Sequence, residues 1–327
     1  MTSLANGAVC KVRTNPGSST SGAGAGKVTN STKPGGSTGS GSTGSNSGSG
    51  GSLQNSTSTG GSKLFLGAVA ATWNMNLAGA TDPASASIWG GLIRGRVANF
   101  GGFTADPINP SIPTLQINYP IGSWTPSAAV PGGASFYVPI GGGSSYNKAL
   151  LTYAVYFPAD FDFVKGGKLP GLFGGDVTQK CSGGLHGGGC WSVRLMWRAN
   201  GAGEAYSYLP ASNDAALCDT TVNPQNICNP TYGNSLNRGA WTFAKGQWTT
   251  LSMYIQMNDV GSSNGILKVW ANNILALEYD ALSYRTDSNV GVDQLFFSTF
   301  FGGSDSSWAS TSNTYTLYKD VSAILGN

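Results

Sequence analysis

Charged residues are scarce in this chain, making up 10% of its 327 residues, whereas an average soluble protein has about 25%. The 18 basic and 15 acidic residues leave a net charge of only +3. A nucleic-acid-binding domain carries a strong excess of Lys and Arg on one face, so we expect no nucleic-acid partner. So small a positive charge remains compatible with a locally basic groove for an anionic ligand.

Histidine and glutamate are also rare, with one histidine, His186, and two glutamates, Glu204 and Glu278. A serine hydrolase needs a base within hydrogen-bond reach of its nucleophile, and His186 is the only histidine that could serve. Glycosidases generally use two carboxylates that flank the scissile bond, and a chain with two glutamates offers few candidates for such a pair. Both classes are therefore disfavoured, although pairs of aspartates such as Asp160 and Asp162 keep a glycoside hydrolase open.

The chain has no run of 18 apolar residues, so we expect neither a membrane span nor a membrane partner. Residues 1–16 lack the apolar core of a signal peptide, and the chain as given has no secretion signal. Low charge with abundant aromatic residues, Ser, Thr and Gly nevertheless suits an extracellular β protein. We therefore expect a secreted, extracellular monomer whose start is truncated or mis-assigned.

Four of the five cysteines bracket two short loops, while Cys10 is left over. The simplest pairing gives the disulfides Cys181–Cys190 and Cys218–Cys228, which agrees with an oxidising compartment. A zinc site is the alternative, but the chain has no CxxC motif and a single histidine. The sequence thus predicts two disulfides and no metal.

Residues 17–62 consist almost entirely of Ser, Gly, Thr and Asn. Such a segment cannot bury enough apolar surface to offset its chain entropy, so we expect a disordered, flexible linker. Two glycosylation sequons, at Asn30 and Asn55, lie inside it. Residues 1–16 would be the remnant of an N-terminal module or a tail without function. Residues 63–327 are expected to form the globular domain.

Short strand-like runs, rich in β-branched and aromatic residues, dominate this domain. They alternate with Gly-rich turns, and no long segment has helical periodicity. The pattern predicts an all-β sandwich or jelly roll. The predicted strands are residues 149–157, 191–198, 204–209, 248–257, 266–270, 274–279, 294–301 and 314–319.

A cluster of basic and phenolic residues is the best candidate for chemistry. Lys168 lies between turns in GGKLPGLFGG, Ser192 and Arg194 lie two apart on one predicted strand, and Tyr206 and Tyr208 lie two apart on the next. Residues two apart in a strand point to the same face. Taken alone, each pattern is also typical of ordinary packing or of a solvated surface.

The loop between these two strands decides whether the cluster shares a face. A five-residue loop, 199–203, places Arg198 opposite Glu204 and Arg194 opposite Tyr208, with all four side chains on one face. A two-residue turn at Asn200-Gly201 would instead turn the tyrosines to the other face.

Such a cluster suits the elimination of a 4-linked uronate. The C5 proton must be removed, the adjacent carboxylate neutralised and the leaving O4 protonated. Arg or Lys can supply the neutralising charge, and a tyrosine with cationic neighbours can act as base or acid. Preorganised positive charge at the developing enediolate would be the largest contribution.

Residues 150–210 closely resemble polysaccharide lyase family 14, a group of alginate and glucuronan lyases with a β-jelly-roll fold. The similar stretches are GGKLPGLFGG, CWSVRLMWR and GEAYSYLP, and the resemblance is weaker over the rest of 63–327. It implies two antiparallel sheets packed as a sandwich with a concave substrate cleft. The family's functional residues correspond here to Lys168, Ser192, Arg194, Tyr206 and Tyr208.

The resemblance implies an endo-acting lyase without a cofactor that gives 4,5-unsaturated oligouronates. Lys168 and Arg194 would lie near the substrate carboxylate, and Ser192 would position the sugar. Tyr208 is the favoured base and acid, and Lys168 or Tyr206 are the competing candidates for proton transfer. His186 is expected to be an incidental loop residue or to line the cleft.

The substrate is expected to be an acidic polysaccharide with β-1,4 linkages, either glucuronan or polymannuronate. Two alternatives remain: a non-catalytic carbohydrate-binding jelly-roll protein and a glycoside hydrolase, since fold alone does not decide function.

Overall fold

The computed structural model describes residues 64–65, 67–91, 93–95, 99–229 and 231–327. The predicted N-terminal remnant, the linker with its two sequons and Cys10 lie outside the described residues, so those statements stay predictions.

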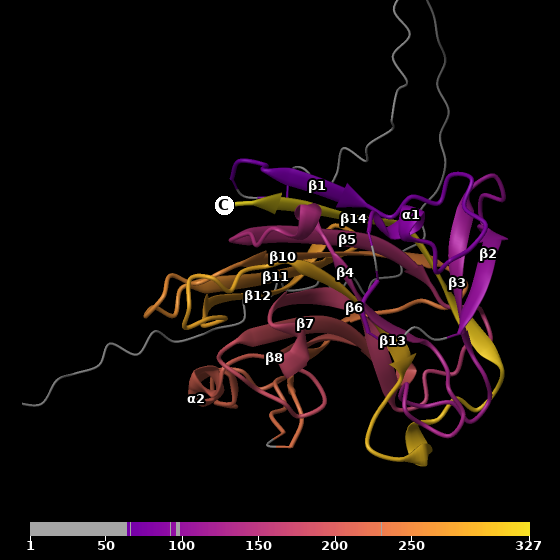
Figure 1. Ribbon diagram of the computed structural model, residues 1–327. Coiled ribbons are helices and arrows are strands. Elements are labelled where there is room, and N and C mark those ends of the chain that lie inside the picture. Colours follow the sequence, from indigo (N-terminus) through magenta and orange to yellow (C-terminus); the bar gives the residue numbers. More distant parts are fainter. Residues whose placement is uncertain (1–63, 66, 92, 96–98, 230) are drawn as a thin grey trace, which may run out of the picture. The chain divides into compact units, whose positions relative to one another are not determined.

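The described chain folds into two antiparallel sheets, which Figure 1 shows as stacked layers. The larger, eight-stranded sheet has the order β12-β11-β10-β5-β14-β3-β2, with β1 paired to β14. Its strands are β1 (Ala71–Asn74), β2 (Phe100–Ala105), β3 (Pro113–Tyr119), β5 (Lys148–Tyr156), β10 (Trp248–Gln256), β11 (Gly265–Ala271), β12 (Ile274–Leu282) and β14 (Thr314–Gly326).

The smaller sheet has six strands in the order β4-β13-β6-β7-β8-β9. They are β4 (Ala134–Pro139), β6 (Gly166–Gly175), β7 (Cys190–Arg198), β8 (Ala202–Tyr208), β9 (Asn234–Thr242) and β13 (Gln294–Phe301). Helices are confined to the connections. They are α1 (Ala86–Trp89), α2 (Asp214–Leu217) and the 3₁₀ turns η2 (Gly141–Gly143), η3 (Val177–Gln179), η4 (Ala199–Gly201), η5 (Ala211–Asn213) and η6 (Ser306–Trp308). The predicted all-β jelly roll is confirmed.

The hydrophobic core lies between the sheets, and alternation along the strands decides which residues enter it. On β7, Val193, Leu195 and Trp197 belong to this core, whereas Arg194 and Met196 lie on the opposite face of the sheet. The apolar positions therefore hold the strand in place and leave its other face to functional side chains.

The prediction that Lys168 lies between turns is wrong, because Gly166–Gly175 is a ten-residue strand, β6. Its glycines are required by close neighbours rather than by turns. A Cβ at Gly167 would lie 2.1 Å from the Trp197 ring, and one at Gly171 would lie 2.1 Å from the Val193 carbonyl oxygen. Glycine inside a strand often marks such a close approach.

The β7–β8 hairpin has a shorter loop than predicted. The turn is Ala199–Gly201, with Asn200 and Gly201 at positive φ, and three-residue loops of this kind are common in hairpins. Arg194 therefore lies opposite Tyr206, not Tyr208, and Met196, not Arg198, lies opposite Glu204. The register differs by two residues, so the side chains keep the predicted common face.

Candidate active site

A cleft of about 610 Å³ lies over the outer face of the six-stranded sheet. This volume is within the usual range for ligand sites. Four strands supply its basic side chains and two of its tyrosines: Lys168 from β6, Arg194 and Arg198 from β7, Tyr206 and Tyr208 from β8 and Arg238 from β9. The structure thus brings four of the five expected functional residues to one cleft.

Lys168 lies at the floor of the cleft and is only 9% exposed. Its Nζ donates to Met196 Sδ at 2.9 Å and lies 3.7 Å from the centroid of the Tyr206 ring. Burial, followed by the nearby charges of Arg194 and Arg198, lowers the pKa of Lys168 well below its usual value. Its free amine form is therefore favoured more than that of a surface lysine.

Arg194 is 3% exposed and is held by aromatic rings more than by hydrogen bonds. Its Cζ lies 4.6 Å from the centroid of Phe296 and 5.4 Å from that of Tyr208. Nη1 donates to Ser298 Oγ at 3.2 Å, and its buried Nε has no partner among the described residues. The guanidinium lines the cleft, so its positive charge is well placed to receive an anionic ligand.

The two tyrosines stand edge to face, with ring centroids 5.7 Å apart. Burial, followed by the neighbouring Tyr208, raises the pKa of Tyr206 above its usual value. Tyr206 therefore stays protonated near neutral pH and can donate a hydrogen bond. Gly233 packs on both rings, since a Cβ there would lie 2.8 Å from Tyr206 and 2.9 Å from Tyr208.

A buried ion cluster lies beside these residues. Glu204 is fully buried and pairs with Arg198, whose Nη2 lies 2.5 Å from Oε1, and with Arg238, whose Nε lies 2.8 Å from Oε2. Ser235 Oγ also donates to Oε2, at 2.6 Å. Burial alone would raise the pKa of Glu204, but the two arginines hold it below its usual value.

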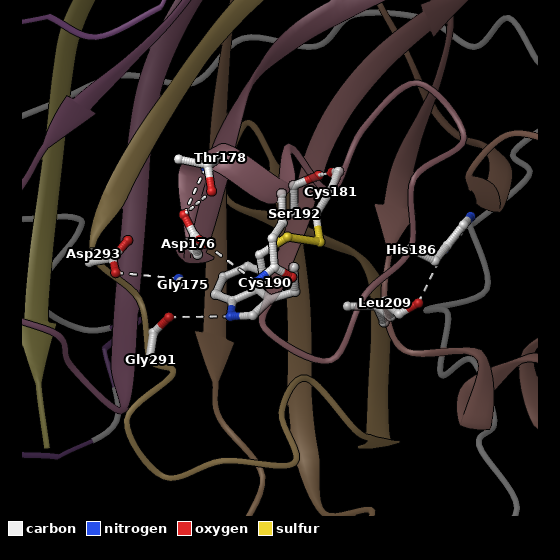
Figure 2. Close-up of a disulfide and its surroundings, with 12 residues drawn as sticks. Gly175, Asp176, Thr178, Cys181, His186, Cys190, Ser192, Leu209, Gly291 and Asp293 are labelled. Carbon is white, nitrogen blue, oxygen red and sulfur yellow. Dashed lines mark hydrogen bonds between the residues drawn. A yellow bond between two sulfur atoms is a disulfide. The ribbon is translucent and has the colours of Figure 1, made fainter.

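Both predicted disulfides are present, Cys181–Cys190 and Cys218–Cys228. Ser192 is fully buried beside the first of them (Figure 2) and donates its hydroxyl to the carbonyl of Cys181 at 2.6 Å. It is not among the residues that line the cleft. The contact that the structure gives Ser192 is thus with the disulfide loop.

His186 also belongs to this loop and lies outside the cleft lining. Figure 2 shows its ring directed at Leu209, whose carbonyl lies 3.2 Å from Nδ1, and Nε2 lies 3.1 Å from the carbonyl of Tyr232. Its ring also packs on Tyr208, with centroids 5.3 Å apart. His186 therefore joins the loop to the segments that follow β8 and precede β9.

Sequence reasoning missed several residues of the cleft. Arg238 comes from β9, Phe296 from β13, and Trp308 from the segment between β13 and β14. The sequence contains no signal for these three residues. It indicated only that Arg198 lies close to Glu204, and the two form an ion pair in the structure. The other residues lie far along the chain, and only the fold brings them together.

The carboxylates proposed for a hydrolase lie elsewhere. Asp160 and Asp162 line a separate pocket of about 520 Å³, and Asp162 accepts bonds from the Val164 amide and the Thr311 hydroxyl. Among the described residues, no Asp or Glu lines the main cleft, and no group of His, Cys, Asp and Glu is arranged to hold a metal ion.

The sequence model of the Polysaccharide lyase 14 family matches residues 108–321. Among solved structures, the chain is similar to a PL-14 alginate lyase from Aplysia kurodai, with 31% identity over 79% of this chain and 100% of the other and a TM-score of 0.65. It is also similar to an alginate lyase from Chlorella virus, with 20% identity over 79% and 100% of the two chains and a TM-score of 0.63.

A comparison with curated proteins gave no match. Within the part of the chain that the structure describes, no helix is long and apolar enough to span a membrane.

Proposed function

The chain belongs to polysaccharide lyase family 14 and is a polysaccharide lyase, and we propose that it cleaves a β-1,4-linked polyuronate at internal linkages by β-elimination. The products are 4,5-unsaturated oligouronates. The substrate is polymannuronate, as in alginate, or glucuronan. The relative at 31% identity is named an alginate lyase, which supports the first of these.

One observation carries this proposal: Lys168, Arg194, Tyr206 and Tyr208 line a single cleft whose described lining has no carboxylate. Hydrolysis of a glycosidic bond generally needs two carboxylates, whereas elimination needs positive charge and a proton carrier. A protein that only binds sugars would not need a buried lysine whose pKa is lowered.

Neutralising the uronate carboxylate is the first requirement, since it makes the C5 proton acidic. Arg194 suits this role because its guanidinium is charged, lines the cleft and can donate two parallel hydrogen bonds to a carboxylate. Tyr206, which burial keeps protonated, can donate a second hydrogen bond to the same sugar. These preorganised donors would stabilise the enediolate that forms when the proton leaves.

Proton transfer is assigned to Lys168 and Tyr208. The lowered pKa of Lys168 favours it as the base that removes the C5 proton, ahead of Tyr208, which the sequence favoured. The electron pair left on C5 then forms the C4–C5 double bond while the C4–O4 bond breaks. Tyr208 gives its phenolic proton to the leaving O4, and proton exchange restores both groups. No water is consumed.

Ser192 acts on the sugar only indirectly in this proposal. Its bond to the Cys181 carbonyl holds the disulfide loop against β7 and so shapes the rim of the cleft. The two disulfides also support secretion, because such bonds persist in oxidising compartments. We further propose that residues 63–327 form the catalytic domain, that residues 17–62 act as a linker to it, and that the protein is a monomer.

Incubation with glucuronan, polymannuronate, polyguluronate and pectate in parallel tests the proposal. The unsaturated product absorbs in the ultraviolet, so a rise in absorbance identifies a lyase and the fastest substrate names its specificity. A rapid fall in viscosity with few new chain ends would support cleavage at internal linkages. No absorbance change with any of the four polymers, in protein shown to be folded, would contradict the proposed substrates.

A further inference from the structure

Glu204 lies directly beneath the end of the cleft marked by Arg198 and Arg238, and it cannot touch a substrate. Its side chain is fully buried, and both oxygens are occupied, Oε1 by Nε and Nη2 of Arg198 and Oε2 by Ser235 and Nε of Arg238. The carboxylate therefore does not act as an acid or base here. Its contacts fix two guanidinium groups side by side.

These guanidiniums outnumber the carboxylate, so the cluster keeps one unit of positive charge. Both arginines line the cleft, and their side chains are 11% and 35% exposed. Among the described residues, the polar contacts of Arg198 are made by Nε and Nη2 and those of Arg238 by Nε and Nη2, so Nη1 of each donates no hydrogen bond. A surplus cation with unused N–H donors on a cleft wall is a site for an anion, preferably a planar carboxylate.

The cluster adjoins the reacting centre but does not coincide with it, since Arg198 Cζ lies 5.6 Å from the centroid of the Tyr206 ring. Arg194 and Arg198 lie on the same face of β7, four residues apart, which corresponds to about 13 Å along a strand. This distance exceeds the length of one pyranose ring. The cluster can therefore meet a different sugar of the same polymer from the one that Arg194 holds.

An aromatic side chain lies at the same end of the cleft. Trp308 lines it from the loop between β13 and β14, is only partly buried, and has its ring centroid 5.8 Å from Arg198 Cζ. The turn before it is fixed, because Asp305 accepts a bond from the Ser307 amide at 2.9 Å and Lys165 Nζ donates to Ser307 Oγ at 2.5 Å. A fixed indole face can pack against the apolar face of a sugar ring.

We propose that Arg198, Arg238 and Trp308 form a second subsite, which binds the next uronate residue of the substrate beyond the one that Arg194 holds. This inference rests on the proposed function and adds to it a reason for preferring long chains. Trp308 would accept the ring, and the arginines would accept its carboxylate. A neutral polysaccharide would leave the surplus charge of the cluster unpaired, so the subsite selects polymers that carry a carboxylate on successive sugars.

The test compares kcat/KM on two oligouronates of defined length: the shortest that the wild type cleaves and one several sugars longer. Arg238→Gln and Trp308→Ala each remove one side of the subsite, and both side chains are partly exposed, so the fold should tolerate the changes. Lys268→Gln is the matched control, since it removes a positive charge on β11 of the other sheet.

Each subsite variant should lose about tenfold or more in kcat/KM on the long oligomer, Arg238→Gln through a lost charged hydrogen bond and Trp308→Ala through the lost packing surface. On the shortest oligomer it should stay within about twofold of the wild type, because that substrate does not need the subsite. Lys268→Gln should resemble the wild type with both substrates. The wild type should therefore prefer the longer chain, and the variants should lose this preference.

Equal losses on both oligomers would overturn the inference, because they would indicate a general disturbance of the cleft. Unchanged kinetics on both would overturn it as well. Neither result would affect the proposed function, which depends on wild-type activity. A wild type that cleaves no polyuronate would refute the proposed function. The subsite would then be tested by calorimetric titration with the long oligomer. Equal affinities of the wild type and Arg238→Gln for this oligomer would refute the subsite.

Discussion

Replacing Glu204 by Gln should destabilise the fold strongly, although the substitution only exchanges one carboxylate oxygen for an NH₂ group. The carboxylate accepts four contacts between 2.5 and 2.8 Å, two from Arg198, one from Ser235 and one from Arg238. A glutamine amide can accept on one side only, and its NH₂ group would face a guanidinium that also donates. Two arginines would then share a buried region without an anion.

Breaking a buried ion pair by removing one partner costs about 3–5 kcal/mol. The lower end applies here, because the Arg238 side chain is 35% exposed and water can solvate it. At about 2–4 °C per kcal/mol for a domain of this size, a loss of about 3 kcal/mol lowers the melting temperature by roughly 6–12 °C.

The only other glutamate in the chain provides the control. Glu278 pairs with Lys268 at 3.0 Å, with side chains 16% and 21% exposed; water reaches both partners and Glu278 has a single cation, so its loss costs less than that of the fully buried Glu204. Calorimetric melting at neutral pH should therefore show a large shift for Glu204→Gln and a small one for Glu278→Gln. Shifts of similar size would refute the view that the cluster is a buried, interdependent unit.

The pH dependence follows from the sign of the pKa shift. The pKa of Glu204 is lower in the folded protein than its ordinary value of 4.5, so its stabilisation is complete above that value and disappears as the pH falls through the lowered pKa. The difference in melting temperature between the wild type and Glu204→Gln should therefore become smaller as the pH falls through the lowered pKa of Glu204.

Three further predictions concern the cleft and its surroundings. Tyr208→Phe should keep the melting temperature but lower kcat by about 10²–10⁴-fold, and near-normal turnover would exclude this hydroxyl from proton transfer. Lys168→Arg should be similarly inactive at every pH, because arginine cannot release its proton. In the wild type, kcat/KM should fall as the pH drops through the lowered pKa of Lys168. An active Lys168→Arg variant would refute the role of Lys168 as the base. Asp293→Asn should stabilise the fold at pH 7 by at most about 3 kcal/mol, because burial raises the pKa of Asp293 from 3.8 to about 6. This gain should vanish below about pH 4, where the aspartate is protonated in both states, and melting curves at the two pH values check it.

Much of the fold can be predicted from the sequence because the strands that were expected carry β-branched and aromatic residues in local patterns. Strand β6 was not predicted, since its glycines look like turns when read locally. Their true reason is tertiary: the Trp197 ring and the Val193 carbonyl leave no room for a Cβ at Gly167 and Gly171. Residue preferences read from the local sequence cannot show that a neighbouring strand leaves no space for a Cβ.

The candidate site was predictable only in part for a similar reason. Spacing on β7 and β8 placed Arg194 and the two tyrosines on one face, and a register error of two residues left that face unchanged. Arg238 and Trp308 could not be placed, because they reach the cleft through β9 and a loop between β13 and β14. Their contribution depends on how distant strands are ordered in the sheet.

The central claim is that the protein breaks its substrate by elimination, and the mass of the products tests this most directly. A purified oligouronate of known mass is incubated with the wild type, and the two fragments of a single cleavage are weighed by mass spectrometry. Elimination predicts that the fragment masses add up to the mass of the substrate, with the new double bond on one fragment. A sum greater by one water molecule would show hydrolysis and would contradict the account.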